Sequence, residues 1–179
     1  MSGSGSDLEK DFFEAVGRAL VAWQRVEGRL VGIYLLLLGS PGTWGAAGAA
    51  FYCVFAVPVK VAMIKEASRW GRLNGFPALL DELDKLLKKI SKTARKRNHL
   101  VHLEGSEIDS EWMIGDPMWD ARMGDKKYYA TKDIVRWANE FDELYKLLLD
   151  FSHRIPSDKT RARVMARQLK PPKRRATLA

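Results

Sequence analysis

Cysteine and histidine are scarce in this 179-residue chain, which has one cysteine and three histidines. The single cysteine, Cys53, has no partner for an internal disulfide, so a disulfide-stabilised scaffold is excluded and a reducing cytoplasmic setting is expected. We predict that Cys53 is a buried small hydrophobic residue. Because no further pair of histidine or cysteine residues completes a four-ligand set with His99 and His102, the sequence predicts no metal site and no cofactor.

Long uninterrupted hydrophobic segments are also missing. No charged residue occurs from Leu30 to Val59, but the glycine-rich stretch 39–45 divides this region into apolar runs of nine and fourteen residues. Each run is shorter than the roughly 20 residues that cross a bilayer, so two core helices joined by a turn are predicted and no membrane span. The start of the chain lacks the basic and apolar regions of a secretory signal, and residues 1–6 are expected to be disordered.

Sequence motifs of several enzyme classes do not occur. The glycine-containing segments 39–42 and 45–48 lack the Gly-Lys-Ser/Thr ending of a phosphate-binding loop. Neither the Gly-x-Ser-x-Gly motif of α/β-hydrolases nor the His-Glu-x-x-His motif of zinc proteases is present. The sequence therefore gives no support to these enzyme classes.

Positive charge is concentrated at the C-terminal end. The formal net charge of the chain is +8, and residues 156–179 include eight basic residues and one acidic residue. Residues 7–155 are predicted to form the folded domain and 156–179 a basic, flexible tail. Such a tail favours an anionic partner such as RNA, and a solubilising tail without a specific partner is the alternative. The tail residues expected to bind nucleic acid are Arg161, Arg163, Arg167, Lys173, Arg174 and Arg175.

Apolar residues recur every three or four positions in four segments, a spacing typical of amphipathic helices. Helices are predicted at about 7–38, at about 43–75 with a kink near Pro58, from about Pro77 onward, and at about 131–155. The helical pattern stops over 109–130, where turn residues predict a small hairpin or ordered loop. Four helices with one apolar face each bury those faces together. The predicted fold is therefore all-α, an antiparallel four-helix bundle with a small hairpin or loop insertion between helices 3 and 4.

Arg97 departs from the pattern of the third predicted helix. At about 100° per residue, Arg97 falls in the middle of the apolar face that continues from Ile90 to Val101. A buried guanidinium needs acceptors, and Glu27, at the edge of the apolar face of the first helix, is a candidate. An Arg97–Glu27 ion pair that only fixes the register of the helices is therefore one interpretation.

Arg97 also opens the segment Arg97-Asn-His-Leu-Val-His102, in which four residues separate an arginine from a histidine. This segment, its place on the third of four helices and the stretch Ala22-Trp-Gln-Arg-Val-Glu27 resemble the HEPN superfamily. The resemblance covers about residues 7–155. It implies a metal-independent endoribonuclease that acts as a homodimer, with the arginine and histidine of both protomers lining a shared cleft. It also implies a toxin or a stress or phage-defence effector as the biological role.

The chemistry of RNA cleavage is compatible with these side chains. Without a metal, a base removes the proton of the 2′-hydroxyl, an acid protonates the departing 5′-oxygen, and a cation stabilises the phosphorane. We therefore expect His102 as general base or acid, Arg97 as phosphate clamp and Asn98 as an orienting hydrogen bonder. Glu27 is expected to contact Arg97 and hold it in position without contacting the RNA itself. Further RNA contacts on the same helix are expected from Lys92, Arg95 and Lys96.

The positions of the two catalytic candidates on an ideal helix add a constraint. Five residues turn a helix by about 500°, so Arg97 and His102 lie about 140° apart and do not share a face. Either the helix loosens before Gly105, or the functional set combines residues of two subunits. His99 lies opposite Ile90 and is interpreted as a solvated residue beside the lysine-bearing face.

The expected partners are RNA and a second copy of the chain, together with an antitoxin or another regulatory protein. In one antitoxin-regulated HEPN subgroup, a tyrosine two residues after the histidine is the modification site. Glu104 occupies that position here, so this mode of control does not carry over. Two other functions are compatible with the sequence. One is a non-catalytic helical module that binds RNA or a protein partner, and the other is a membrane-surface protein anchored by its tail.

Overall fold

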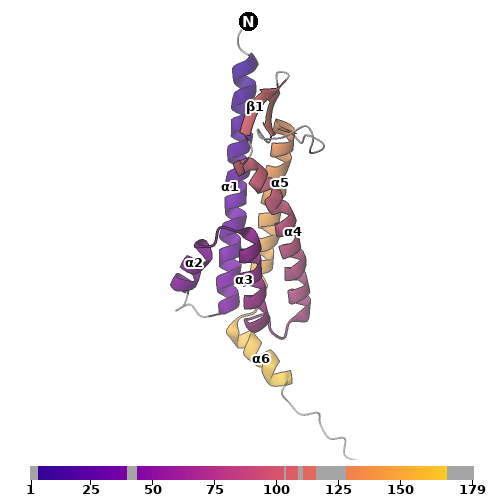
Figure 1. The fold of residues 1–179 in the computed structure, drawn as a ribbon. Coiled ribbons are helices and arrows are strands. Elements are labelled where there is room, and N and C mark those ends of the chain that lie inside the picture. The colour runs from indigo at the N-terminus through magenta and orange to yellow at the C-terminus, as the bar shows by residue number, and fades with distance from the viewer. Residues whose placement is uncertain (1–3, 40–43, 103, 109–110, 116–127, 169–179) are drawn as a thin grey trace, which may run out of the picture.

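The computed structural model describes residues 4–39, 44–102, 104–108, 111–115 and 128–168. These residues form six helices and one small antiparallel sheet (Figure 1). The elements are α1 (Ser4–Leu38), α2 (Trp44–Tyr52), α3 (Val57–Trp70), α4 (Pro77–His102), β1 (Glu104–Ile108), β2 (Glu111–Gly115), β3 (Tyr129–Ala130), α5 (Thr131–His153) and α6 (Asp158–Gln168). The described chain is therefore mostly helical, as predicted, with a minor β element.

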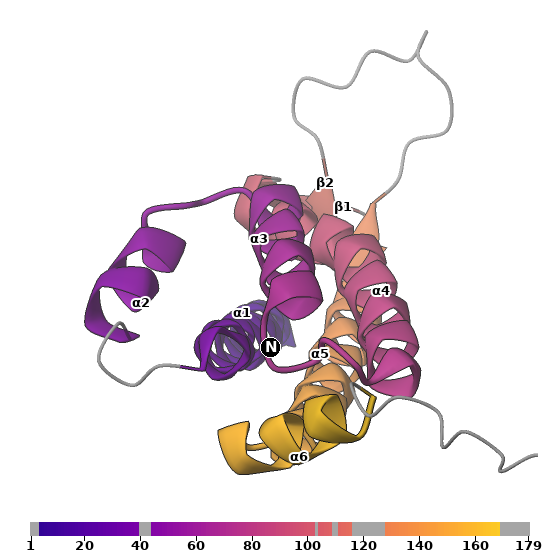
Figure 2. The same ribbon diagram turned by 90° about the horizontal axis from the view of Figure 1, so that it is seen from below.

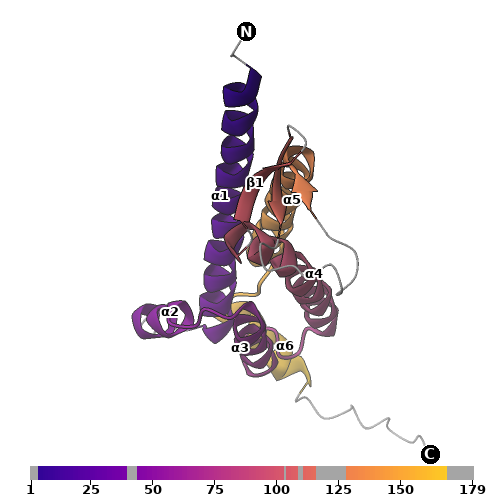
Figure 3. The same ribbon diagram turned by 45° about the horizontal axis from the view of Figure 1, so that its top comes forward.

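Helices α1 and α5 lie side by side and form the centre of the core (Figures 1 and 3). Their facing residues recur every three or four positions, and Ile33 and Phe141, for example, are both 0% exposed. The apolar face of α4 is buried in the same way at Leu83 and Ile90. The core residues of α1 and α5 include Phe12, Ala19, Trp23, Val26, Leu30, Leu37, Ile134, Trp137, Leu144, Leu148 and Phe151. The predicted apolar faces of these helices are confirmed.

The prediction of one kinked helix over 43–75 is wrong. The chain forms α2 and α3, separated by the link 53–56, and α2 lies on the side of α1 and α3 that is remote from α4 (Figure 2). Pro58 stands in the first turn of α3, where the absence of an amide N–H breaks no helical hydrogen bond. The helix therefore begins anew at Val57 and does not bend through the proline. Cys53, predicted to be buried, is exposed in the link.

The turn between α3 and α4 lies against the end of α1. The backbone N–H of Arg72 donates to the carbonyl oxygen of Leu37 at 3.1 Å. A Cβ atom added to Gly71 would lie 2.1 Å from the same oxygen, so this close approach requires glycine. The turn reverses the chain and leaves the first residues of α3 beside the second half of α4.

The insertion between α4 and α5 is a sheet with the strand order β1-β2-β3. Strands β1 and β2 pair in antiparallel register, with Ser106 opposite Met113. The insertion begins earlier than the predicted range 109–130, because β1 follows directly on α4. Trp112 packs against the Phe12 ring, with 5.6 Å between the ring centroids, and so attaches the sheet to α1. Residues 109–110 and 116–127 of the predicted insertion lie outside the described residues.

Both ends of the chain contain more helix than predicted. Residues 4–6 belong to α1, whereas disorder was expected for 1–6, of which 1–3 lie outside the described residues. The first part of the predicted flexible tail forms α6. The Asp158 carboxylate accepts two hydrogen bonds from the Arg72 guanidinium, at 2.9 and 2.8 Å, and these attach α6 to the α3–α4 turn. Residues 169–179 lie outside the described residues.

Candidate functional site

A groove with a volume of about 780 Å³ opens between the start of α3 and the second half of α4. We refer to it as the α3–α4 groove. Its volume is within the range of ligand-binding sites in proteins. All three predicted catalytic residues, Arg97, Asn98 and His102, line this groove. The rest of its lining consists of Ser91, Ala94, Arg95 and Val101 of α4 and residues 55–58 on the opposite wall.

Asn98 lies at the centre of the α4 wall of the groove. Around the helix axis, His102 is displaced from Asn98 by about 40°, and Arg97 by about 100° in the opposite direction. Arg97 and His102 are therefore about 140° apart around the helix axis, as expected. Both still line one groove of a single chain, because the groove extends over a wide part of the helix surface. Helix α4 continues to His102, so the helix does not loosen between the two residues.

The three residues differ in exposure. Arg97 is half-buried, whereas Asn98 and His102 are exposed. The Nη1 atom of Arg97 donates to the Oδ1 atom of Asn98 at 3.4 Å, which is long for a hydrogen bond. In the part of the chain that the structure describes, Arg97 forms no ion pair with a carboxylate. Since a guanidinium has five N–H donors, most of them are available to an anion in the groove.

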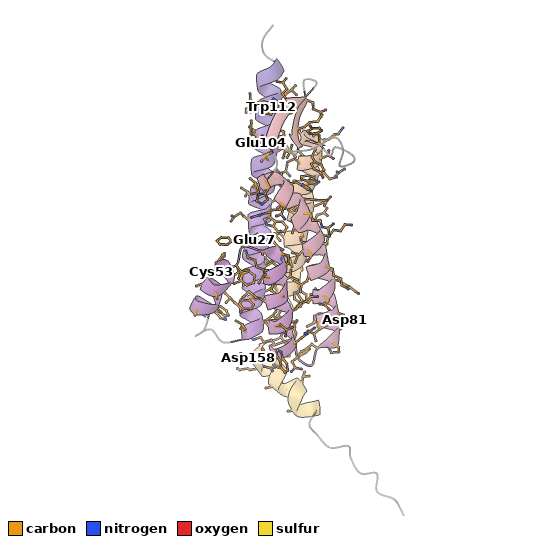
Figure 4. All side chains as sticks on the ribbon, viewed as in Figure 1. Glu27, Cys53, Asp81, Glu104, Trp112 and Asp158 are labelled. Atoms are coloured by element: carbon orange, nitrogen blue, oxygen red, sulfur yellow. The ribbon has the colours of Figure 1, made fainter. Side chains whose placement is uncertain are left out.

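Glu27 is bonded to residues other than Arg97, so the expected Arg97–Glu27 contact is wrong. Its Oε2 atom accepts a hydrogen bond from Lys60 Nζ at 3.2 Å, and its Oε1 atom accepts one from Trp23 Nε1 at 2.8 Å. Glu27 lies well inside α1, away from both helix ends (Figure 4). Lys60 reaches it because it is on the buried face of α3, between Val57 and Ile64. The sequence signal for this contact is the helical spacing of Lys60 with those two apolar residues.

His99 does not have the solvated position that was predicted from the sequence. It is half-buried, and its ring centroid lies 5.0 Å from that of Tyr129 and 6.1 Å from that of Trp137. The Tyr129 hydroxyl lies 3.5 Å from the Nε2 atom of His99. Burial, and to a lesser degree the nearby Asp133, raise the pKa of Tyr129 above its ordinary value. His99 therefore packs against β3 and α5 and is not part of the groove lining.

The basic residues of α4 that were expected to contact RNA have different surroundings. Arg95 lines the groove and is exposed. Lys92 is exposed on α4 but outside the groove lining. Lys96 forms an ion pair with Glu140 of α5 and thereby connects the two helices. Of the three, only Arg95 is brought together with the predicted catalytic residues.

Two of the predicted RNA-binding residues of the tail, Arg161 and Arg163, are remote from the groove. Arg161 and Arg163 belong to α6, which is attached by Arg72 to the end of α3 that lies away from the groove. Figure 4 shows Asp158, the first residue of α6, at the opposite end of the molecule from Glu104, which follows α4 closely. Arg167 is also a residue of α6. Lys173, Arg174 and Arg175 lie outside the described residues.

Metal-binding clusters and membrane-spanning helices are both absent from the described residues. No three His, Cys, Asp or Glu side chains among them are grouped in a way that suits a metal ion. None of the described helices has the length and apolar character that crossing a bilayer requires. Comparisons of the chain with protein-family models, curated proteins and solved structures find no match. The α3–α4 groove is therefore the feature that bears most directly on function.

Proposed function

We propose that this chain is a metal-independent endoribonuclease of the HEPN type that cleaves RNA in the α3–α4 groove, in the role of a toxin or a stress or phage-defence effector. One observation carries the proposal: Arg97, Asn98 and His102 line the same open groove. The pairing of Glu27 with Lys60 supports it, because it removes the acid that a purely structural Arg97 would use.

The three side chains have separate tasks in the proposed reaction. The 2′-oxygen of the substrate attacks the adjacent phosphorus as a histidine base accepts its proton, and the bond from phosphorus to the 5′-oxygen breaks as an acid protonates that oxygen. The products are a 2′,3′-cyclic phosphate and a free 5′-hydroxyl. His102 performs a proton transfer, and Arg97 binds the phosphate oxygens through its planar fork. Asn98, in contact with Arg97, orients the guanidinium.

The proposal includes a homodimer. The reaction needs a proton acceptor at the 2′-oxygen and a proton donor at the 5′-oxygen, and the described lining of the groove contributes one histidine, His102. A second copy that lies against the same part of α4 supplies the other histidine. The helices α1, α3, α4 and α5 are the candidates for the antiparallel four-helix bundle that the four apolar faces predict. A cytoplasmic setting and a regulatory protein partner belong to the same proposal.

The test is cleavage of labelled RNA in the presence of EDTA. The wild-type protein is expected to cut the RNA and leave 2′,3′-cyclic phosphate ends, and His102→Ala is expected to abolish the reaction. His153→Ala is the matched control, because His153 is the last residue of α5 and does not line the groove. A folded His102→Ala protein that cleaves RNA as fast as wild type would refute the proposal. RNA binding by a wild type that does not cleave would instead favour the non-catalytic module.

A further inference from the structure

Among the large hydrophobic side chains that the structure describes, Phe55 is the most exposed, with 89% of its surface accessible. It lies in the link between α2 and α3 and lines the α3–α4 groove. Single exposed apolar residues are common on protein surfaces. Phe55 differs from them because its ring borders a groove with cationic side chains, so that one ligand can contact the ring and the cations together.

The backbone is anchored on both sides of Phe55. On the N-terminal side, the N–H of Val54 donates to the carbonyl oxygen of Phe51 at 3.3 Å, and the Phe51 side chain is buried. On the C-terminal side, Val57 is buried, and Pro58 in the first turn of α3 has a restricted φ angle. The backbone that carries the exposed Phe55 ring is therefore held on both sides.

The side chains that line the groove define the chemistry of the ligand. The α4 wall contributes the guanidinium groups of Arg95 and Arg97 and the imidazole of His102, and no carboxylate lines the groove in the described part of the chain. Ala94 and Val101 add small apolar surfaces. A ligand with both negative charge and a flat apolar face satisfies the two parts of the site. Nucleotides of a single strand combine these properties.

We propose that Phe55 stacks on a base of single-stranded RNA next to a phosphate that Arg97 binds. This inference rests on the proposed function and adds the substrate class, an RNA with unpaired bases. A base inside an A-form duplex is stacked on both faces, so its flat surface is not accessible to Phe55. Because every base has an aromatic face and phenylalanine has no hydrogen-bonding group, the contact selects unpaired RNA with little preference among the bases.

Binding is measured separately from cleavage, in proteins that all carry His102→Ala. Fluorescence anisotropy of a short labelled single-stranded RNA gives the Kd. Adding Phe55→Ala is expected to raise the Kd by about 10-fold or more, the effect of losing one stacked base, and Phe55→Trp is expected to preserve it. Tyr52→Ala is the matched control, since Tyr52 is an aromatic residue of α2 that is 60% exposed and outside the groove lining. All variants should keep the thermal midpoint, because the substituted side chains are exposed.

Equal affinities of the Phe55→Ala protein and its parent for single-stranded RNA would overturn the inference. An equal loss of affinity for a duplex of the same sequence would overturn it too. A second copy of the chain is the alternative partner for the Phe55 ring. Sedimentation velocity tests for it by measuring whether the protein is a dimer or a monomer. Dissociation of Phe55→Ala into monomers with unchanged RNA affinity would assign the ring to a protein contact and also overturn the inference.

The cleavage and binding measurements distinguish failure of the nuclease proposal from failure of the stacking contact. If the wild-type protein binds single-stranded RNA through Phe55 but does not cleave it, the nuclease proposal fails and the stacking contact is supported. If the wild type cleaves and Phe55→Ala binds normally, the nuclease proposal is supported and the stacking contact fails.

Discussion

The Lys60 ammonium lies 3.2 Å from the Oε2 atom of Glu27, and the two side chains are 5% and 20% exposed. The indole N–H of Trp23 donates a hydrogen bond to the other carboxylate oxygen, with 2.8 Å between Nε1 and Oε1. Both oxygens of Glu27 therefore have donors from within the core. Since the acid expected to bind Arg97 is bonded to these groups, the position of Arg97 at the α3–α4 groove is not explained by an ion pair with α1.

Disruption of the Lys60–Glu27 pair is expected to destabilise the protein. Lys60→Ala and Glu27→Ala should each lower the free energy of unfolding by about 3 kcal/mol, because each leaves a largely buried charge without its partner. The double variant should lose less than the sum. Arg97→Ala removes a half-buried side chain from the groove wall and should change the free energy of unfolding by about 1 kcal/mol or less. Urea denaturation measures all four, and an equal loss for Arg97→Ala and Lys60→Ala would contradict this assignment.

Arg97→Lys separates the charge of Arg97 from its shape. Lysine keeps the positive charge but loses the planar fork that binds two phosphate oxygens, so cleavage is expected to fall by about 10²-fold or more. The free energy of unfolding should stay close to that of wild type. Single-turnover cleavage assays and urea denaturation on the same preparations measure both quantities. A lysine variant that cleaves at the wild-type rate would show that Arg97 does not clamp the phosphate.

Helical periodicity accounts for the part of the fold that was predictable. A residue such as Ile33 or Phe141 is buried because its helix has one apolar face, and that face is visible as a spacing of three and four in the sequence. The break between α2 and α3 was not predictable in the same way. Pro58 is compatible with a kink inside a helix and with the first turn of a new one, and the packing of Val57 and Phe51 determines which occurs.

The sequence predicted which residues of α4 belong to the candidate site, but not which side chains contact one another in space. Arg97, Asn98 and His102 were found because they are close together in the sequence. The pairing of Glu27 depends on the packing of α3 against α1, which no local pattern specifies. The neighbours of His99 come from β3 and α5, about 30 or more positions along the chain. Phe55 was not predictable from the sequence, because an exposed aromatic residue in a link belongs to no periodic pattern.

A homodimer is expected, with an interface around residues 97–102. The proposed reaction uses one histidine from each copy, and Val101 in this region is an exposed apolar residue, 47% accessible. Light scattering at micromolar concentration should give the mass of two chains. Val101→Asp should shift the measured mass toward that of a single chain. Val21→Asp is the control, because Val21 is an exposed valine of α1 that is not part of the α3–α4 groove. A wild-type monomer at this concentration would contradict the dimer.

Removal of residues 169–179 is expected to weaken RNA binding without changing the thermal midpoint. The truncation deletes Lys170, Lys173, Arg174 and Arg175 but leaves α6 whole. For single-stranded RNA, the slope of log K against log salt should decrease by about 0.7 for each phosphate that these side chains no longer neutralise. Anisotropy titrations over a series of salt concentrations measure the slope. Unchanged affinity at low salt would show that these residues do not bind RNA.

The attachment of α6 is expected to depend on pH through Asp158. Hydrogen bonds from Arg72 hold the pKa of the Asp158 carboxyl below its ordinary value. A lowered pKa in the folded protein means that the pair stabilises the attachment above the ordinary pKa of about 4 and that this stabilisation is lost as the pH falls further. Asp158→Asn should therefore loosen α6 at neutral pH, and the difference from wild type should shrink in acid.

NMR spectra of the backbone amides of α6 over a pH series measure this attachment. Glu82→Gln is the matched control, because Glu82 is a partly exposed acid whose pKa is lowered in the same direction by its hydrogen bond with Arg154, a residue that precedes α6. It should leave the α6 amides unchanged if Asp158 holds the helix. Arg72→Ala should have a larger effect than Asp158→Asn, since the same guanidinium also donates to the Gly39 carbonyl at 2.8 Å. Identical α6 spectra for wild type and Asp158→Asn at neutral pH would show that the helix is held by other contacts.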